Sequence, residues 1–140
     1  MSVPDAFEKG VQALKEQRPA ERVEAIAEVD NMIIVRLGTY ELSEYEPPYP
    51  DDSVDIYARI GRNFPDWTGN RKGFITSPPL DRESGALNNN PWDVPAKDAV
   101  KQVTGEPAQS YSWDWRNVPM DEPEHMAYAH DLAQNMLQHG

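Results

Sequence analysis

Three histidines and no cysteine limit the chemistry that this chain of 140 residues can perform. Without a thiol, the chain has no disulfide, no thiolate metal site and no thiol nucleophile. The candidate acid or base groups are His125 and His130, each acting with a nearby carboxylate. They are five residues apart in a segment with helical spacing, about 140° apart around a helix axis, so they cannot converge on one metal ion. The sequence predicts no metal site and no cofactor.

Other catalytic patterns are missing from the sequence. No serine lies in a Gly-x-Ser-x-Gly pattern, and no glycine-rich phosphate loop is followed by a lysine. The paired carboxylates Asp51-Asp52 and Asp121-Glu122 are neighbours in the chain, which favours a solvated surface over a convergent acid pair. The first hypothesis is therefore a protein with no catalytic activity. The alternative is a cysteine-free enzyme that uses His125 or His130 with an acid.

The tryptophans are the most distinctive candidates for binding. In the segment SYSWDWRNVP, Trp113 and Trp115 share one face of an extended chain, with Tyr111 two residues earlier. Such aromatic residues usually pack in a core, and they anchor partner proteins when they are exposed. We take Trp92, Trp113 and Trp115 as candidate protein-binding residues. Burial of all three would exclude that role.

The charge of the chain narrows the choice of partner. Twenty-four acidic and 13 basic residues give a formal net charge of −11, which repels nucleic acids and anionic membranes. The acids are scattered and lysine is scarce, a composition that looks halophilic, although an ordinary acidic protein has similar features. The first residues do not resemble a signal peptide, and no apolar run approaches the length of a membrane span. We expect a cytoplasmic protein whose partner is another protein.

The elements that must position these residues follow from periodicity. Ser2 and Asp5 form a capping-box pattern that predicts a helix running to about Arg18. Alternating apolar residues predict four antiparallel strands, and Asp30-Asn31 is expected to form a tight turn between the first two. The strands are predicted near residues 23–29, 33–37, 54–60 and 73–77.

The rest of the chain is expected to be irregular until its last helix. Residues 81–109 show little periodicity, apart from a possible short helix within 95–103. Asp121 is expected to cap the final helix. The prediction is a single α+β domain over residues 1–140, with an N-terminal helix, a four-stranded antiparallel meander, a long irregular segment and a C-terminal helix packed on the sheet. The helices are expected on one face, and Asp55, Tyr57 and Arg59 on a partly solvated second face.

Three segments carry a resemblance to a known family. They are VDIYARIGRNFPDW at 54–67, GFITSPPL at 73–80 and SWDWRNVPMDEPEHMAYAHDLAQNML at 112–137. Their order resembles the ubiquitin-conjugating-enzyme (UBC) fold and its relatives, including RWD domains and the prokaryotic members. The resemblance implies a UBC-like domain over nearly the whole chain.

The chain departs from that family at its reactive centre. Active members carry a cysteine in the loop after the fourth strand, with an asparagine upstream, whereas this chain has Asn88, Asn89 and Asn90 there and no cysteine. Ser84, with no adjacent base, is a poor replacement nucleophile. The resemblance therefore implies a non-catalytic binding or adaptor module that engages a ubiquitin-like or activating-enzyme-like protein. The three asparagines are either turn formers or redeployed site residues. A structural protein of a salt-loving host is a further alternative.

Overall fold

The sheet of this protein has six antiparallel strands, in the order β1-β2-β3-β4-β6-β5. The computed structural model describes residues 2–45, 49–69, 71–80, 88–90 and 94–140. The α+β class is confirmed, but the sheet is larger than the four strands expected. The elements are α1 (Asp5–Gln17), β1 (Glu24–Val29), β2 (Met32–Glu41), β3 (Ser53–Gly61), β4 (Gly73–Ser77), β5 (Asn88–Asn89), α2 (Val94–Thr104), β6 (Gln109–Ser112), the 3-10 helix η2 (Pro123–Ala127) and α3 (Tyr128–His139).

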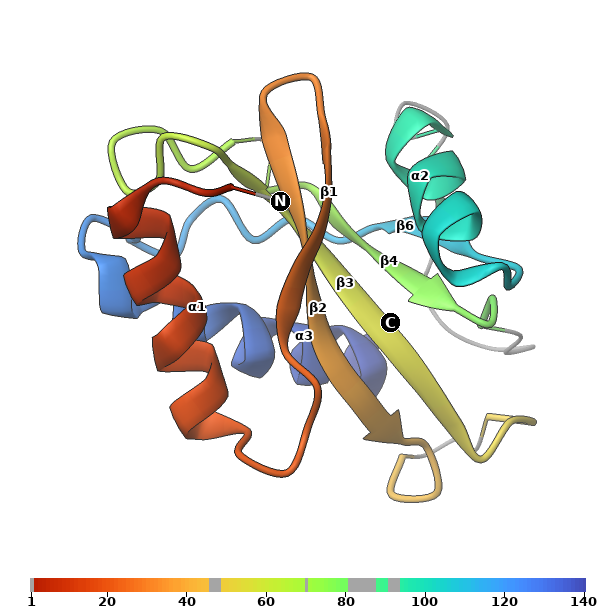
Figure 1. Cartoon of the computed structure of the whole chain (residues 1–140). Coiled ribbons are helices and arrows are strands. Elements are labelled where there is room, and N and C mark those ends of the chain that lie inside the picture. The colour runs from red at the N-terminus through yellow and green to blue at the C-terminus, as the bar shows by residue number, and fades with distance from the viewer. Residues whose placement is uncertain (1, 46–48, 70, 81–87, 91–93) are drawn as a thin grey trace.

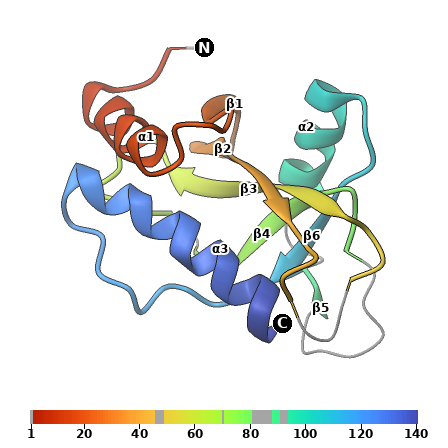
Figure 2. The same ribbon diagram turned by 90° about the horizontal axis from the view of Figure 1, so that it is seen from below.

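Helices lie on both faces of the sheet. Figures 1 and 2 show α1 and α3 on one face and α2 on the other. Tyr57 is only 1% exposed because it packs in a second apolar cluster with Ala96 and Val100 of α2. The expectation that all helices share one face, leaving Tyr57 partly solvated, is therefore wrong. Asp55 and Arg59, its neighbours on β3, are partly exposed.

The first hairpin confirms the predicted turn. Asp30 and Asn31 have φ values of 52° and 64°, the left-handed conformation that a tight turn between antiparallel strands requires. Ile26, which interrupts the alternation in the sequence, lies where the β1–β2 register shifts between Ala25 and Ala27. Because of this bulge, Ala27 and Val29 face the second apolar cluster together with Ile26, whereas Ala25 packs against the main core.

Both predicted helix caps differ from the structure. Pro4 precedes α1 and no side chain caps that helix, so the Ser2 cap is wrong. Pro can occupy such a position because its missing N–H would have no partner inside the helix. The last helix begins with η2, whose N-cap is Glu122 instead of Asp121.

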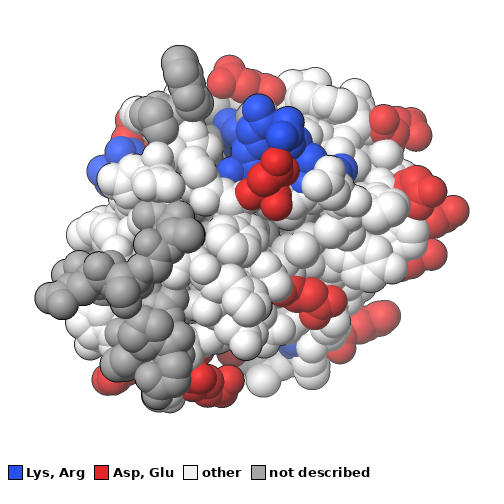
Figure 3. Space-filling model, turned by 180° about the vertical axis from the view of Figure 1, so that it is seen from behind, with Lys and Arg blue, Asp and Glu red and all other residues white. Residues whose placement is uncertain are grey.

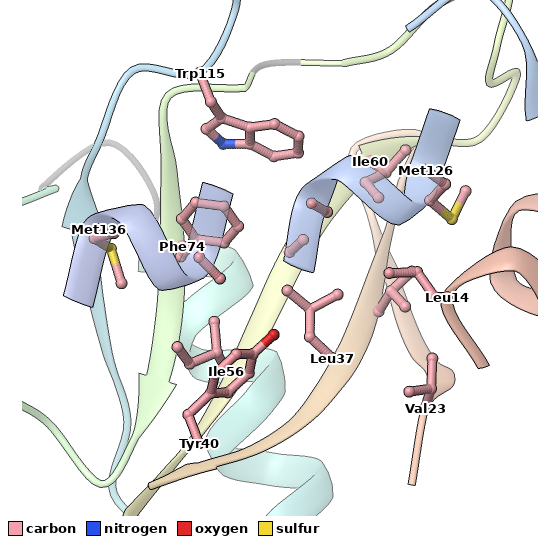
Figure 4. Close-up of a cluster of buried hydrophobic side chains, with 14 of the residues drawn as sticks. Leu14, Val23, Leu37, Tyr40, Ile56, Ile60, Phe74, Trp115, Met126 and Met136 are labelled. Carbon is pink, nitrogen blue, oxygen red and sulfur yellow. The ribbon is translucent and has the colours of Figure 1, made fainter. Parts of the chain in front are cut away.

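The main core lies between the sheet and the α1–α3 layer (Figure 4). Trp115 is 2% exposed, and its ring stacks on Phe74 with centroids 5.1 Å apart. Gly10 lets α1 approach η2, because a Cβ at this position would lie 2.6 Å from the Met126 methyl carbon.

None of the helices in the described ranges has the length and apolar character needed to cross a bilayer.

Candidate functional site

A pocket of about 390 Å³ lies on the second face of the sheet. The basic side chain at its centre, Arg36, is already bound by residues of the chain itself. Arg36 binds Asp55 with Nη1–Oδ2 and Nη2–Oδ1 distances of 2.8 and 3.1 Å. The same guanidinium donates to the Tyr57 hydroxyl, the Thr39 hydroxyl and the Arg22 carbonyl. This network joins β2 to β3 and holds the chain that enters β1, so we assign it a structural role.

A second pocket, of about 350 Å³, contains two of the residues singled out from the sequence. We call it the Trp113 pocket. It is lined by Lys72, Asn90, Ser112, Trp113, Asp114 and Arg116.

Strand pairing brings these distant residues together. Ser112 of β6 lies opposite Gly73 of β4 on one side and opposite Asn88 of β5 on the other. The antiparallel pairing continues past the strand, because the Trp113 N–H donates to the Lys72 carbonyl at 2.8 Å. Trp113 is therefore fixed beside Lys72 by the backbone ladder itself.

Arg71 holds the chain that follows Trp113. Its guanidinium donates to the backbone carbonyls of Trp115, Arg116 and Val118. Its carbonyl also accepts the Trp115 N–H at 2.9 Å. Burial lowers the Arg71 pKa and the nearby Asp114 charge opposes this shift. Arg71 is thus occupied as a structural clamp for residues 115–118.

The charges around the pocket are not equivalent. Asp114 and Arg116 form a bidentate pair, with Oδ1–Nε and Oδ2–Nη2 distances of 2.9 and 2.7 Å. Hydrogen bonds from the Arg116 side chain and backbone hold the Asp114 pKa well below its usual range. Asp114 therefore neutralises Arg116, while Lys72 is exposed beside them. Figure 3 shows basic side chains gathered around an acidic one on this face of the molecule.

The three candidate tryptophans have different environments. Trp113 is partly buried, packs against the main core and lines the pocket. Trp115 is fully packed in the core, and its Nε1 donates to the Gly73 carbonyl at 3.2 Å, so a binding role for Trp115 is wrong in this structure. Trp92 lies outside the described residues.

The asparagines lie beside the same pocket. Asn88 and Asn89 form the short strand β5 and are exposed. Asn90 is 9% exposed, and its N–H donates to the Ser110 carbonyl at 2.9 Å. The structure therefore brings Asn90 and Trp113 together, which the sequence alone did not predict.

His125 serves as a helix cap. Its Nδ1 lies 3.3 Å from the Asp121 N–H nitrogen and 3.2 Å from that of Glu122, and accepts both hydrogen bonds when it is unprotonated. The Asp121 carboxylate is 3.1 Å from the same nitrogen, and the ring stacks on Tyr128 with centroids 5.1 Å apart. Capping and an ion pair use the same atom, so His125 can do only one at a time.

His130 lies between α3 and the sheet. Its Nδ1 is 2.8 Å from the Tyr40 hydroxyl, and its ring is half-buried. Burial, followed by the positive charge of Arg18, lowers the His130 pKa, and Asp131 opposes this. Neither His130 nor His125 lines the Arg36 pocket, the Trp113 pocket or a third pocket, which Glu44, Tyr45, Gln134 and Gln138 line.

No group of three or more metal-ligating side chains occurs within the described parts of the chain.

The charged residues of the pocket were missed in the sequence. Lys72 directly precedes β4, and Asp114 and Arg116 flank Trp115, some forty positions further along the chain. The sequence did contain one clue to the pocket: the chain has only 13 basic residues, and two of its segments that contain them, at Arg71-Lys72 and at Arg116, come together in the fold. That signal becomes informative only when residues 109–112 are recognised as a partner of β4.

The chain matches no protein-family model, no curated protein and no solved structure. Its function is therefore inferred from the geometry of the Trp113 pocket.

Proposed function

We propose that this chain is a non-catalytic protein-binding or adaptor module, and that the Trp113 pocket with the adjoining strand β5 is its binding surface. One observation carries the proposal. Trp113 is a partly exposed aromatic residue whose backbone is fixed by the hydrogen bond to Lys72, and it lies between a charged pair and an exposed lysine. Aromatic anchors of this kind, set among polar groups, dominate the energetics of protein interfaces. A backbone that is already fixed reduces the entropy lost on binding.

The proposal includes a UBC-like ancestry for the fold. The order of α1, four strands that neighbour one another in chain order, and a final helix supports it. Strands β5 and β6 and the placement of α2 on the second face are departures from the expected pattern. Because the chain has no cysteine, it cannot hold a thioester. A non-catalytic role beside a ubiquitin-like or activating-enzyme-like partner is consistent with that chemistry.

Affinity capture tests the binding surface. The chain is immobilised and exposed to a lysate of its source organism, in parallel with Trp113→Ala and Trp67→Ala. Trp67 is a matched control because it is 44% exposed and lies outside the pocket. We expect the original chain and Trp67→Ala to retain the same protein in stoichiometric amount, and Trp113→Ala to lose it while keeping its circular-dichroism spectrum. Equal capture by Trp113→Ala, or loss with Trp67→Ala alone, contradicts the proposal.

A further inference from the structure

We propose that the Trp113 pocket binds an acidic segment of its partner, with a carboxylate against Lys72 and a neighbouring apolar group against the Trp113 ring. This inference rests on the proposed function and adds the chemistry of the partner. Three basic side chains, Arg71, Lys72 and Arg116, lie around one acid, Asp114, in a chain whose net charge is −11.

Lys72 is the cation that remains available to a ligand. The Arg71 guanidinium is occupied by three backbone carbonyls, and Arg116 is held by the Asp114 carboxylate. Within the described ranges, the ammonium group of Lys72 has no hydrogen-bond or ion-pair partner, and the residue is exposed. A strongly hydrated ammonium on a flexible stem binds a carboxylate as a point charge.

Trp113 supplies the apolar half of the site. Its backbone N–H donates to the Lys72 carbonyl, so the two residues lie side by side just beyond the paired ends of β6 and β4. The ring packs against the main core on one side and borders the pocket on the other. A segment with an acidic and an apolar residue close together matches this pair.

Because the whole chain is acidic, an acidic segment of a partner is expected to bind at the Trp113 pocket and not elsewhere on the surface. A basic segment is attracted to most of a surface that carries scattered acids, so charge alone does not direct it to one site. An acidic segment is repelled by most of that surface and attracted here, and a difference of this kind produces specificity. At 0.15 M salt the screening length is about 8 Å, which weakens the distant repulsion more than a contact pair.

Selection from a phage-displayed library of random peptides tests the charge preference. The original chain, Lys72→Glu and Lys101→Glu are panned separately at physiological salt. Lys101→Glu is the matched control, since Lys101 is exposed on α2, outside the pocket, and the change in net charge is identical. We expect the original chain and Lys101→Glu to select peptides rich in Asp and Glu. We expect Lys72→Glu to bind the best of these peptides about tenfold more weakly.

The outcomes separate this inference from the proposed function. Selected peptides without an acidic excess, or with equal affinity for Lys72→Glu, overturn the acidic preference. If their binding is still lost in Trp113→Ala, the pocket itself stands. Peptides that bind Trp113→Ala unchanged overturn both proposals. A selection that returns no binding peptide also overturns the acidic-segment proposal, although a larger folded partner then remains open to the capture experiment.

Discussion

Replacing Trp115 with Phe is expected to lower the free energy of unfolding by about 2 kcal/mol. The phenyl ring retains the stacking on Phe74 but loses the hydrogen bond from Nε1 to the Gly73 carbonyl, which is worth about 1 kcal/mol. The space that the smaller ring leaves in a site only 2% exposed costs about another 1 kcal/mol. The change adds no charge and leaves the surface unaltered.

Urea denaturation followed by far-ultraviolet circular dichroism measures this loss. The midpoint is expected to fall while the slope of free energy against urea stays constant, because the surface exposed on unfolding is unchanged. Trp113→Phe is the matched control and is expected to cost less than about 1 kcal/mol, since Trp113 is only partly buried. A Trp115 variant no less stable than the Trp113 variant would refute the assignment of Trp115 to the core.

Three further predictions concern pH, the clamp and backbone strain. Because burial lowers the pKa of His130, the unfolded chain takes up a proton at higher pH than the folded chain, so stability is full above about pH 6.5 and declines as pH falls towards the folded pKa. Urea titrations across this range are expected to show a smaller decline for His130→Gln, and an identical decline contradicts the reasoning. Arg71→Lys is expected to cost about 1–2 kcal/mol and to speed amide exchange at residues 115–118, because one ammonium cannot reach three carbonyls; unchanged exchange there argues against the clamp. In thermal unfolding, Gly38→Ala is expected to be more destabilising than Gly105→Ala. Both glycines have a positive φ, 112° and 71°, which is unfavourable for alanine. An added Cβ at Gly38 would also lie 2.8 Å from two side-chain atoms, whereas one at Gly105 would meet nothing within 4 Å.

Local patterns in the sequence predicted the first hairpin turn and the alternation of β3, but not the helix caps. The left-handed turn at Asp30-Asn31 follows from residue types that tolerate positive φ. The alternation of β3 correctly separated the side chains of Val54, Ile56, Ala58 and Ile60, in the main core, from that of Tyr57. It could not reveal that α2 covers Tyr57, because that contact depends on a helix some forty residues later.

For the same reason, the sequence predicted the aromatic residues of the candidate site but not its charged residues. Tyr111, Trp113 and Trp115 do contact the same core cluster, as their period of two predicted. Their different burial depends on where β6 pairs, and β6 is too short for its pattern to stand out in the sequence. Without the β4–β6 pairing, nothing in the sequence joins Lys72 to Trp113.

The most direct test of the binding surface is an NMR titration of the isotopically labelled chain with the protein retained in the capture experiment. Chemical shifts report the residues whose surroundings change on binding. We expect the indole N–H of Trp113 and the backbone amides of Lys72, Ser112 and Arg116 to shift, while the indole N–H of Trp67 stays in place. Shifts confined to the Trp67 loop or to α2, with the Trp113 signal unchanged, would contradict the account.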